Sequence, residues 1–184
     1  MSFVIKSIHA VNYLFKTIIM KARYRSNISM AGLIKKRFDT QIIIEKQGKL
    51  ILGKGVSFQR NVSISTVGGL LEIGDNTSFN RNCIVISREK ISIGSNVIFG
   101  PGVTIYDHDH RFSCKGIMPG YKHGSVIIEN GCWIGANVTI LRNTHIGEGC
   151  VIGASTVVKG NIPPHSLVTG ERNMNVIPII EKKA

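Results

Sequence analysis

Residues 126–158 read VIIENGCWIGANVTILRNTHIGEGCVIGASTVV and decide the fold, because an aliphatic residue recurs in them at every sixth position. The series consists of Ile128, Ile134, Ile140, Ile146, Ile152 and Val158. Glycine follows three of these residues, and a small or apolar residue stands two positions before each. A fixed short period of this kind indicates a repeat architecture in which each unit stacks on its neighbours.

The six-residue step continues upstream in three groups of three aliphatic or aromatic residues: Leu52, Phe58, Ile64; Ile73, Phe79, Val85; and Ile93, Phe99, Ile105. Each hexad is one short strand and one turn, with the large apolar residue pointing inward and a small residue allowing the sharp turn. Three hexads close one coil of a triangular prism. The sequence therefore predicts a mainly β protein in which residues 50–162 form a left-handed parallel β-helix of about five coils.

Breaks in the period all follow the third hexad of a coil. Ile64 to Ile73 is nine residues, Val85 to Ile93 is eight, and Ile105 to Ile128 is twenty-three. The insertions should stack at one corner of the prism, and the largest should form one long protruding loop over residues 109–125. Long loops in a regular scaffold are usually functional, although a harmless surface excursion is the alternative.

The two ends lie outside the repeat. Residues 1–49 form an N-terminal segment and lead-in, of which residues 1–37 have helical spacing of apolar residues among basic ones. This amphipathic helix either docks on the coil or a neighbouring subunit, or lies on an anionic membrane surface. At the other end, Pro163 and Pro164 should end strand pairing, because proline has no amide donor. Residues 163–184 then form a C-terminal tail.

Composition and charge limit the partners, metal sites and cellular locations that we expect for this protein. The formal charge is +12, and residues 1–40 hold eight basic residues against one acid. We expect no nucleic-acid partner, because no recognition motif accompanies the charge. The four cysteines lack zinc-site spacing, and three of them occupy small inward positions of hexads. No secretory signal is evident, so we expect a cytoplasmic protein, peripheral to the inner face of the membrane if the helix binds lipid.

The segment Tyr106-Asp-His-Asp-His-Arg111 stands where the long loop departs. As a metal site, His108 and His110 with Asp107 lack an evident third spaced ligand. As a proton-transfer site, an imidazole can accept a proton from an attacking hydroxyl near neutral pH. A solvated polar turn is the third interpretation.

Three blocks of sequence resemble the hexapeptide-repeat O-acetyltransferases, which include galactoside, maltose and xenobiotic acetyltransferases. The blocks are FGPGVTIYDH (99–108), ENGCWIGANV (129–138) and IGASTVVKGNIPPHS (152–166). The chain looks most like family members that acetylate capsule or O-antigen sugars. The resemblance implies a homotrimer with active sites between subunits, acetyl-CoA as co-substrate, a carbohydrate acceptor and no metal.

The resemblance also implies roles for individual residues. His108 matches the general base, and Ala136 matches a residue whose backbone amide contacts the thioester. Ala154 and Lys159 match positions further along the cofactor track, and Trp133 matches a tryptophan beside the cofactor groove. Asn80 matches an asparagine that contacts acceptor hydroxyls. We expect Asp107 and His110, which flank the base, to lie at the acceptor as well.

The hexad count gives an independent geometric expectation. Asn80, Ala136 and Ala154 follow second hexads, whereas His108 follows a third hexad. They therefore line different corners of one prism and would meet only across a subunit interface. The sequence predicts acetyl transfer from acetyl-CoA to a sugar hydroxyl of a bacterial surface polysaccharide or its precursor. The alternatives are another acceptor (an amino sugar, serine or an antibiotic) and a β-helix scaffold without catalysis.

Overall fold

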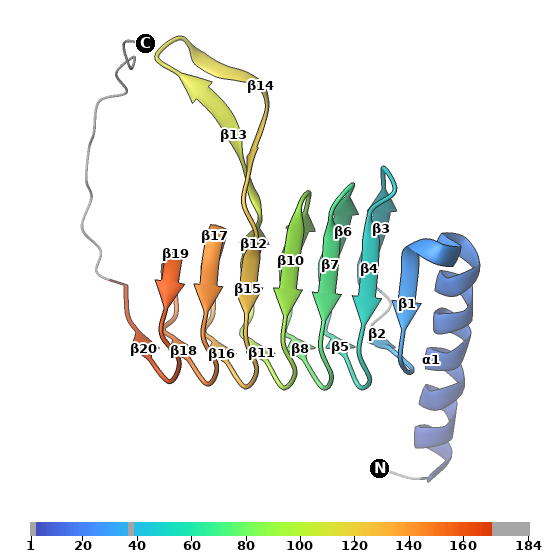
Figure 1. Ribbon diagram of the computed structural model, residues 1–184. Helices are drawn as coiled ribbons and strands as arrows, with labels where there is room; N and C mark the ends of the chain where they lie inside the picture. The colour runs from blue at the N-terminus through green and yellow to red at the C-terminus, as the bar shows by residue number, and fades with distance from the viewer. Residues whose placement is uncertain (1–2, 37–38, 171–184) are drawn as a thin grey trace.

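The chain folds into a parallel β-helix whose strands stack in register along one axis (Figure 1). The computed structural model describes residues 3–36 and 39–170. The predicted mainly β fold with a helical N-terminal segment is confirmed. None of the described helices combines the length and the hydrophobicity that crossing a bilayer requires.

Strands on three faces make up each coil. The first face holds β1 (Ile28–Met30), β4 (Lys49–Leu52), β7 (Leu70–Ile73), β10 (Lys90–Ile93) and β15 (Val126–Ile128). The second face holds β2 (Lys35–Lys36), β5 (Ser57–Phe58), β8 (Ser78–Phe79), β11 (Ile98–Phe99), β16 (Trp133–Ile134), β18 (Val151–Ile152) and β20 (Leu167–Val168). The third face holds β3 (Gln41–Glu45), β6 (Ser63–Val67), β9 (Ile84–Ser87) and β12 (Thr104–Tyr106). β17 (Thr139–Ile146) and β19 (Val157–Ile162) run from the third face of one coil to the first face of the next.

The coil count is six rather than the predicted five, because the first coil lies in the segment assigned to the lead-in. β1, β2 and β3 pair in parallel with β4, β5 and β6. In this coil the inward position of the second face is Lys36, which pairs with Phe58. A lysine in the apolar series hides the period. Its Nζ donates to the carbonyl of Thr40 at 2.7 Å, and burial, with help from Lys16, lowers the pKa of the Lys36 ammonium group.

The proline pair does not end strand pairing. Pro163 and Pro164 lie in the turn before β20, which pairs in parallel with β18. A proline in a turn removes no ladder hydrogen bond, so a further strand follows. The tail from residue 171 onward, including the apolar residues at 176–180, lies outside the described residues.

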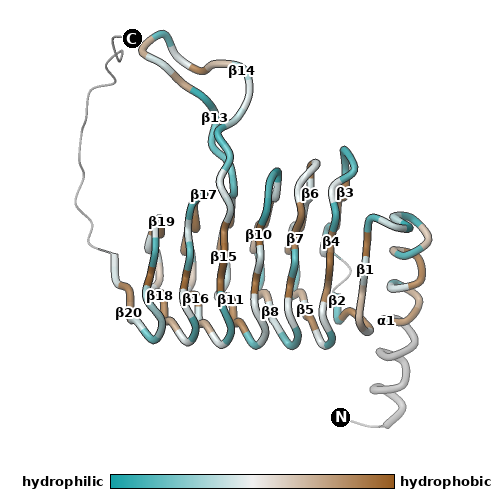
Figure 2. Tube along the Cα trace, viewed as in Figure 1, coloured by the Kyte–Doolittle hydropathy of each residue, from teal (hydrophilic) through white to brown (hydrophobic). Residues whose placement is uncertain are grey.

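The core is a single column of inward residues inside the prism. The predicted hexad residues from Leu52 to Val158 are all buried. On the second face Phe58, Phe79 and Phe99 stack, with ring centroids 5.3 and 4.5 Å apart. Cys83, Cys132 and Cys150 are buried as expected, and burial raises the pKa of the Cys83 thiol to about 11. In the coils, apolar segments follow the strands and hydrophilic ones the turns (Figure 2).

Turns between faces depend on residues that tolerate left-handed backbone. Among the described residues, six asparagines have positive φ, including Asn61 and Asn82, whose side chains hydrogen-bond between coils at 2.9 Å. Asparagine accepts this conformation more readily than most residues. A Cβ on Gly135 would lie 2.7 Å from the backbone nitrogen of Ala154, so glycine there allows adjacent coils to approach closely.

Helix α1 (Phe3–Tyr24) packs on the first coil and ends well before residue 37, where the predicted helical segment ended. Thr17 and Met20 are buried, and the Tyr24 hydroxyl donates to the carbonyl of Ile42 at 2.7 Å. Arg25 has positive φ, and a single 3-10 turn, η1 (Arg25–Asn27), leads directly into β1. Docking on the coil is thus confirmed for this helix.

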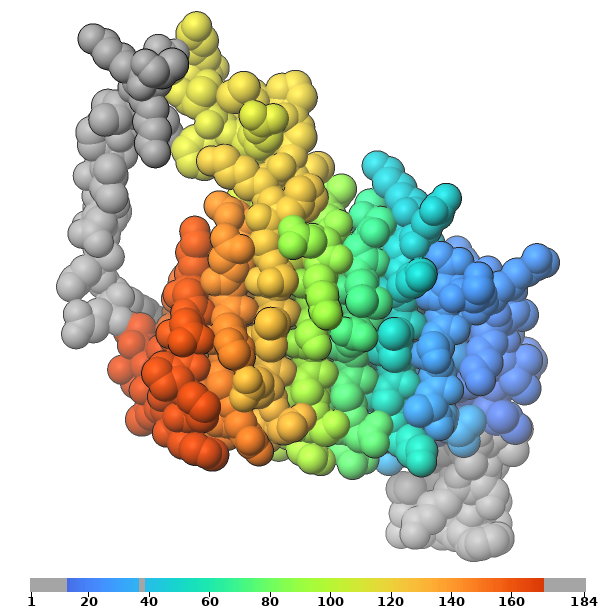
Figure 3. Space-filling view, in the orientation of Figure 1, coloured from blue at the N-terminus to red at the C-terminus, as the bar shows by residue number. Residues whose placement is uncertain are grey.

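The predicted long loop is a β-hairpin. β13 (His108–Ser113) pairs antiparallel with β14 (Gly116–His123), with an irregularity between His110 and Arg111. The hairpin leaves the corner between the third and first faces, where the shorter insertions also lie, and projects beyond the coils (Figures 1 and 3). The stacking of all three insertions at one corner is as predicted.

Candidate active site

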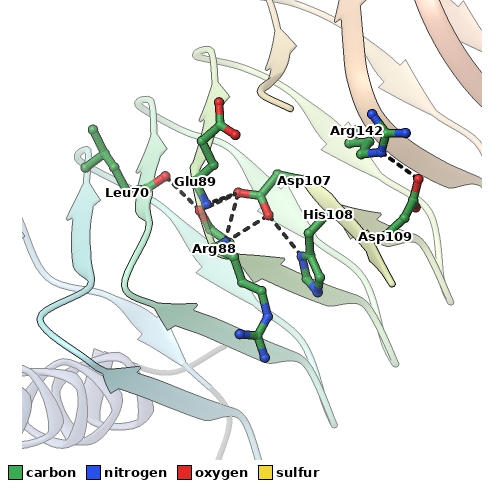
Figure 4. A network of polar contacts seen from close by, with 8 residues as sticks. Leu70, Arg88, Glu89, Asp107, His108, Asp109 and Arg142 are labelled. Atoms are coloured by element: carbon green, nitrogen blue, oxygen red, sulfur yellow. Dashed lines mark hydrogen bonds and ion pairs between the residues drawn. The ribbon is translucent and has the colours of Figure 1, made fainter. Parts of the chain in front are cut away.

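The site is built on the carboxylate of Asp107, which is completely buried at the start of the hairpin (Figure 4). Its oxygens accept hydrogen bonds from the Ser87 hydroxyl at 2.9 Å and from the backbone amides of Arg88 and Glu89 at 2.9 and 2.8 Å. These donors come from the same corner of the preceding coil. Such hydrogen bonds hold a buried carboxylate in one orientation.

The carboxylate in turn holds the ring of His108. Nδ1 of His108 lies 3.0 Å from Oδ1 of Asp107, and the imidazole is only 12% exposed. A carboxylate partner assigns the proton to Nδ1 and leaves Nε2 with a free lone pair. Tyr106 and Tyr121 meet the ring at centroid distances of 5.9 and 5.3 Å, both nearly edge-on. His108 is therefore oriented as a proton acceptor through Nε2.

The hairpin completes one wall of the site. Tyr121 lies 4.8 Å from the ring of His110 and 6.3 Å from that of His123, between centroids. Asp109 ion-pairs with Arg142 of β17, with 2.6 Å between Oδ2 and Nε, which ties the base of the hairpin to the next coil. His110 and His123 are both exposed.

An open hollow of about 620 Å³ lies at this corner. We call it the corner hollow, and its polar and aromatic lining includes Arg88, Tyr106, His108, His110, Phe112 and Tyr121. In the described part of the chain, no group of three or more His, Cys, Asp and Glu residues is placed to hold a metal ion. The oriented imidazole of His108 lines this hollow and can transfer a proton there.

Other predicted site residues lie at another corner. Asn80, Ala136 and Ala154 follow β8, β16 and β18, at the corner between the second and third faces. The third face separates them from His108, as the hexad count predicted. A second, separate hollow contains Asn80, and its lining does not include His108.

The backbone around Ala136 and Ala154 offers hydrogen-bond donors. The hydrogen bonds found among the described residues include none donated by the amide of Ala136 or Ala154. The carbonyl of Ala136, by contrast, accepts from the amide of Ser155 at 2.8 Å. Two successive turns thus present unused N–H groups at the same corner.

The last two predicted cofactor residues lie on different parts of the coil. Trp133 points outward from the second face, between Ile98 and Val151, and is 56% exposed. Lys159 is exposed in β19 at the corner between the third and first faces, so it lies apart from Ala136 and Ala154.

The structure thus brings together Asp107, His108 and His110 and adds residues that sequence reasoning missed. Ser87 and Arg88 contribute from the preceding coil, and the eight-residue step from Val85 to Ile93 was the available signal. That step marks an insertion at the corner from which the hairpin departs. Their contacts with Asp107 could not be derived from spacing alone.

The chain is similar in sequence to a known protein family and to several curated proteins. A profile of the family "Bacterial transferase hexapeptide (six repeats)" matches residues 125–160. WbbJ of Escherichia coli K12, whose name describes a lipopolysaccharide biosynthesis O-acetyl transferase, is 30% identical over 138 residues. That match covers 69% of this chain and 70% of WbbJ. The chain spans about half the length of other curated relatives that it matches.

Solved structures share the fold. The hexapeptide-repeat acetyltransferase VCA0836 of Vibrio cholerae has a TM-score of 0.58 and 27% identity, over 71% of this chain and 74% of that protein. AntD, an N-acyltransferase from Bacillus cereus, has a TM-score of 0.70 over 90% of this chain and 87% of AntD. Its identity is 19%, so this second likeness concerns the fold alone.

Proposed function

The chain belongs to the hexapeptide-repeat acetyltransferases, and on this premise we propose that it transfers an acetyl group from acetyl-CoA to a sugar hydroxyl. The acceptor is a bacterial surface polysaccharide or its precursor, as the name of WbbJ suggests for that relative. The observation that carries the proposal is the hydrogen bond between His108 and the buried Asp107 carboxylate, in a hollow open to an acceptor.

The chain's own residues have two tasks in this reaction. Acetyl-CoA supplies an acyl group that is already activated as a thioester, so no protein nucleophile is needed. Nε2 of His108 takes the proton of the acceptor hydroxyl as the hydroxyl oxygen bonds to the acyl carbon. The imidazolium then donates this proton to the sulfur of the departing CoA thiolate as the C–S bond breaks. The unused amide of Ala136 supports binding of the acyl oxygen, where negative charge develops.

These two groups come from different subunits in our proposal. His108 and Ala136 lie at corners separated by the third face of the same chain. We therefore propose a homotrimer in which the His108 corner of one subunit faces the Ala136 corner of its neighbour. Trp133 and Ala154, from that neighbour, then border the cofactor, and Asn80 borders the acceptor.

Substitution of His108 tests the reaction. His108→Ala should keep the fold, by circular dichroism, and lower kcat by about 10²- to 10⁴-fold, measured as free thiol release. His145→Ala is the matched control. His145 also pairs with a carboxylate, that of Glu129, at 2.8 Å, but its side chain is partly exposed on the outer side of the first face. That hydrogen bond lowers the pKa of Glu129. Equal turnover in the two variants would refute the assignment.

A panel of acceptors separates the proposed reaction from its alternatives. Thiol release with neutral and charged sugars, amino sugars, serine and an aminoglycoside identifies the nucleophile. Preference for an amine would replace O-acetylation with N-acetylation at the same base. Failure to bind acetyl-CoA in calorimetry would favour a scaffold without catalysis.

The exposed face of helix α1 supports the proposal that the protein lies at the cytoplasmic face of the membrane. Leu14, Phe15, Ile18 and Ile19 are exposed although the opposite side of the helix is buried on the first coil. The helix sequence contains no acidic residue, and Lys21 and Arg23 stand in its last turn. An apolar face flanked by cations fits a surface of anionic lipid, near which lipid-linked precursors are found.

A further inference from the structure

We propose that Arg88 binds an anionic group of the acceptor, a carboxylate or a phosphate, beside the hydroxyl that His108 deprotonates. This inference rests on the proposed function and names the class of acceptor: an acidic sugar or a phosphorylated sugar. The proposed binding site is the corner hollow. Under the proposed function, His108 is the only residue lining it that has been given a role.

Arg88 is a cation that lacks an anionic partner within the described chain. The ion pairs among the described residues involve Lys90, Arg142, His108 and His145, but not Arg88. The Nε atom of Arg88 is buried and has no hydrogen-bond partner there. Leaving a buried charged donor unpaired is costly, and Arg88 lines the corner hollow, so its guanidinium can donate there to an anionic ligand.

The position of Arg88 relative to the base is fixed by three contacts. Its backbone amide donates to the Asp107 carboxylate at 2.9 Å, the same carboxylate that holds His108. Its guanidinium carbon lies 4.1 Å from the ring centroid of Tyr121, a cation–π contact, and Tyr121 also meets His108. Figure 4 shows the side chains of Arg88 and His108 extending to the same side of the carboxylate.

Arg88 and Asp109 line the corner hollow, and of these two charged side chains only Arg88 has no ion pair among the described residues. Asp109 is neutralised by Arg142, and Asp107 is buried behind the wall with its oxygens already hydrogen-bonded. The side chain of Glu89 points away from the Arg88 guanidinium (Figure 4). Arg88 is thus the charge that an incoming ligand meets.

The geometry of the guanidinium group determines which anions can bind to it. Its planar fork of N–H donors matches two oxygens of a carboxylate or phosphate, and the cation–π contact with Tyr121 holds the guanidinium beside the hairpin. A uronic acid carries such a carboxylate, whereas a sugar phosphate or a diphosphate-linked precursor carries phosphate oxygens at the anomeric carbon. Either group would place a ring hydroxyl of the sugar near His108.

Matched acceptors test the inference. We would compare glucuronic acid with glucose, and galactose 1-phosphate with methyl galactoside, by kcat/KM from thiol release. The wild type should prefer the anionic member of one pair, mainly through KM, and Arg88→Gln should reduce that preference about 10- to 100-fold. Arg88→Lys should restore part of it. Arg60→Gln removes an exposed arginine from another coil and should leave the preference unchanged.

The outcomes separate a ligand site from a structural role. A preference for the uronate or for the phosphate identifies which anion is bound. If Arg88→Gln slowed charged and neutral acceptors equally, or lowered the melting temperature without changing preference, Arg88 would only support Tyr121 and the inference would fail.

Binding measured without turnover separates this inference from the proposed function. Inorganic phosphate and glucuronate should each be titrated into wild type and Arg88→Gln by calorimetry. Binding to the wild type that the variant loses supports the anion site even if no sugar is acetylated. Absence of both binding and acceptor preference in the wild type would overturn it.

Discussion

Asp107 supports both the corner between the third and first faces and the ring of His108, the general base in our proposal. Its carboxylate accepts from Ser87, from two backbone amides and from His108. Asp107→Asn would replace one acceptor by an N–H₂ donor that faces other donors. We expect the free energy of unfolding to fall by about 1–3 kcal/mol, and kcat to fall because Nδ1 of His108 loses its charged partner.

Urea denaturation and thiol release measure these two effects. Asp109→Asn is the control for stability, because its partly exposed pair with Arg142 should contribute less than about 1 kcal/mol. A variant at Asp107 as stable and as active as the wild type would show that the carboxylate neither supports the corner nor orients the base.

The sequence singled out Asp107 and His108, but not the residues that support them. His108 and Asp107 are adjacent in the chain, so a motif reveals both. Ser87 and Arg88 reach the site only because one coil stacks on the next, some twenty residues earlier in the chain. The pairing register that brings them there follows from the repeat, but the direction of each side chain does not.

At the scale of elements, the phenylalanine stack on the second face stabilises adjacent coils. Phe79 is fully buried between Phe58 and Phe99. Phe79→Ala should lower the free energy of unfolding by about 3–5 kcal/mol, because it leaves a cavity that two rings border. Ile98→Ala, at a 55% exposed position on the neighbouring strand, should cost less than about 1 kcal/mol.

We would compare the two variants by the midpoints of their urea unfolding curves. Similar losses of stability would mean that the outward face of the coil is as packed as its interior.

The six-residue period placed these side chains correctly, because inward and outward positions alternate with the strand pleat. It missed the first coil because Lys36 occupies an inward position, and it missed the hairpin because β13 and β14 are largely exposed and do not follow the six-residue period.

At the scale of the whole molecule, helix α1 leaves one apolar face uncovered. We expect the protein to sediment with vesicles that contain phosphatidylglycerol, more strongly than with phosphatidylcholine alone, and less strongly at high salt. A Phe15→Ser, Ile18→Ser double variant should lose this binding, because both side chains are exposed on that face.

Leu167→Ser provides the control, because it removes an exposed apolar side chain at the opposite end of the stack. If the double variant bound vesicles as well as the wild type, the exposed face of α1 would have to be assigned to a protein neighbour instead.

The proposed reaction requires that two corners from different subunits meet. A crystal structure of the protein with acetyl-CoA tests this directly, together with the mass in solution, expected at three times the 20.2 kDa chain. We predict that the thioester lies against the amide of Ala136 of one subunit and faces Nε2 of His108 of the next, with room for one hydroxyl between. A thioester bound far from every His108, or a monomeric protein that turns over normally, would contradict it.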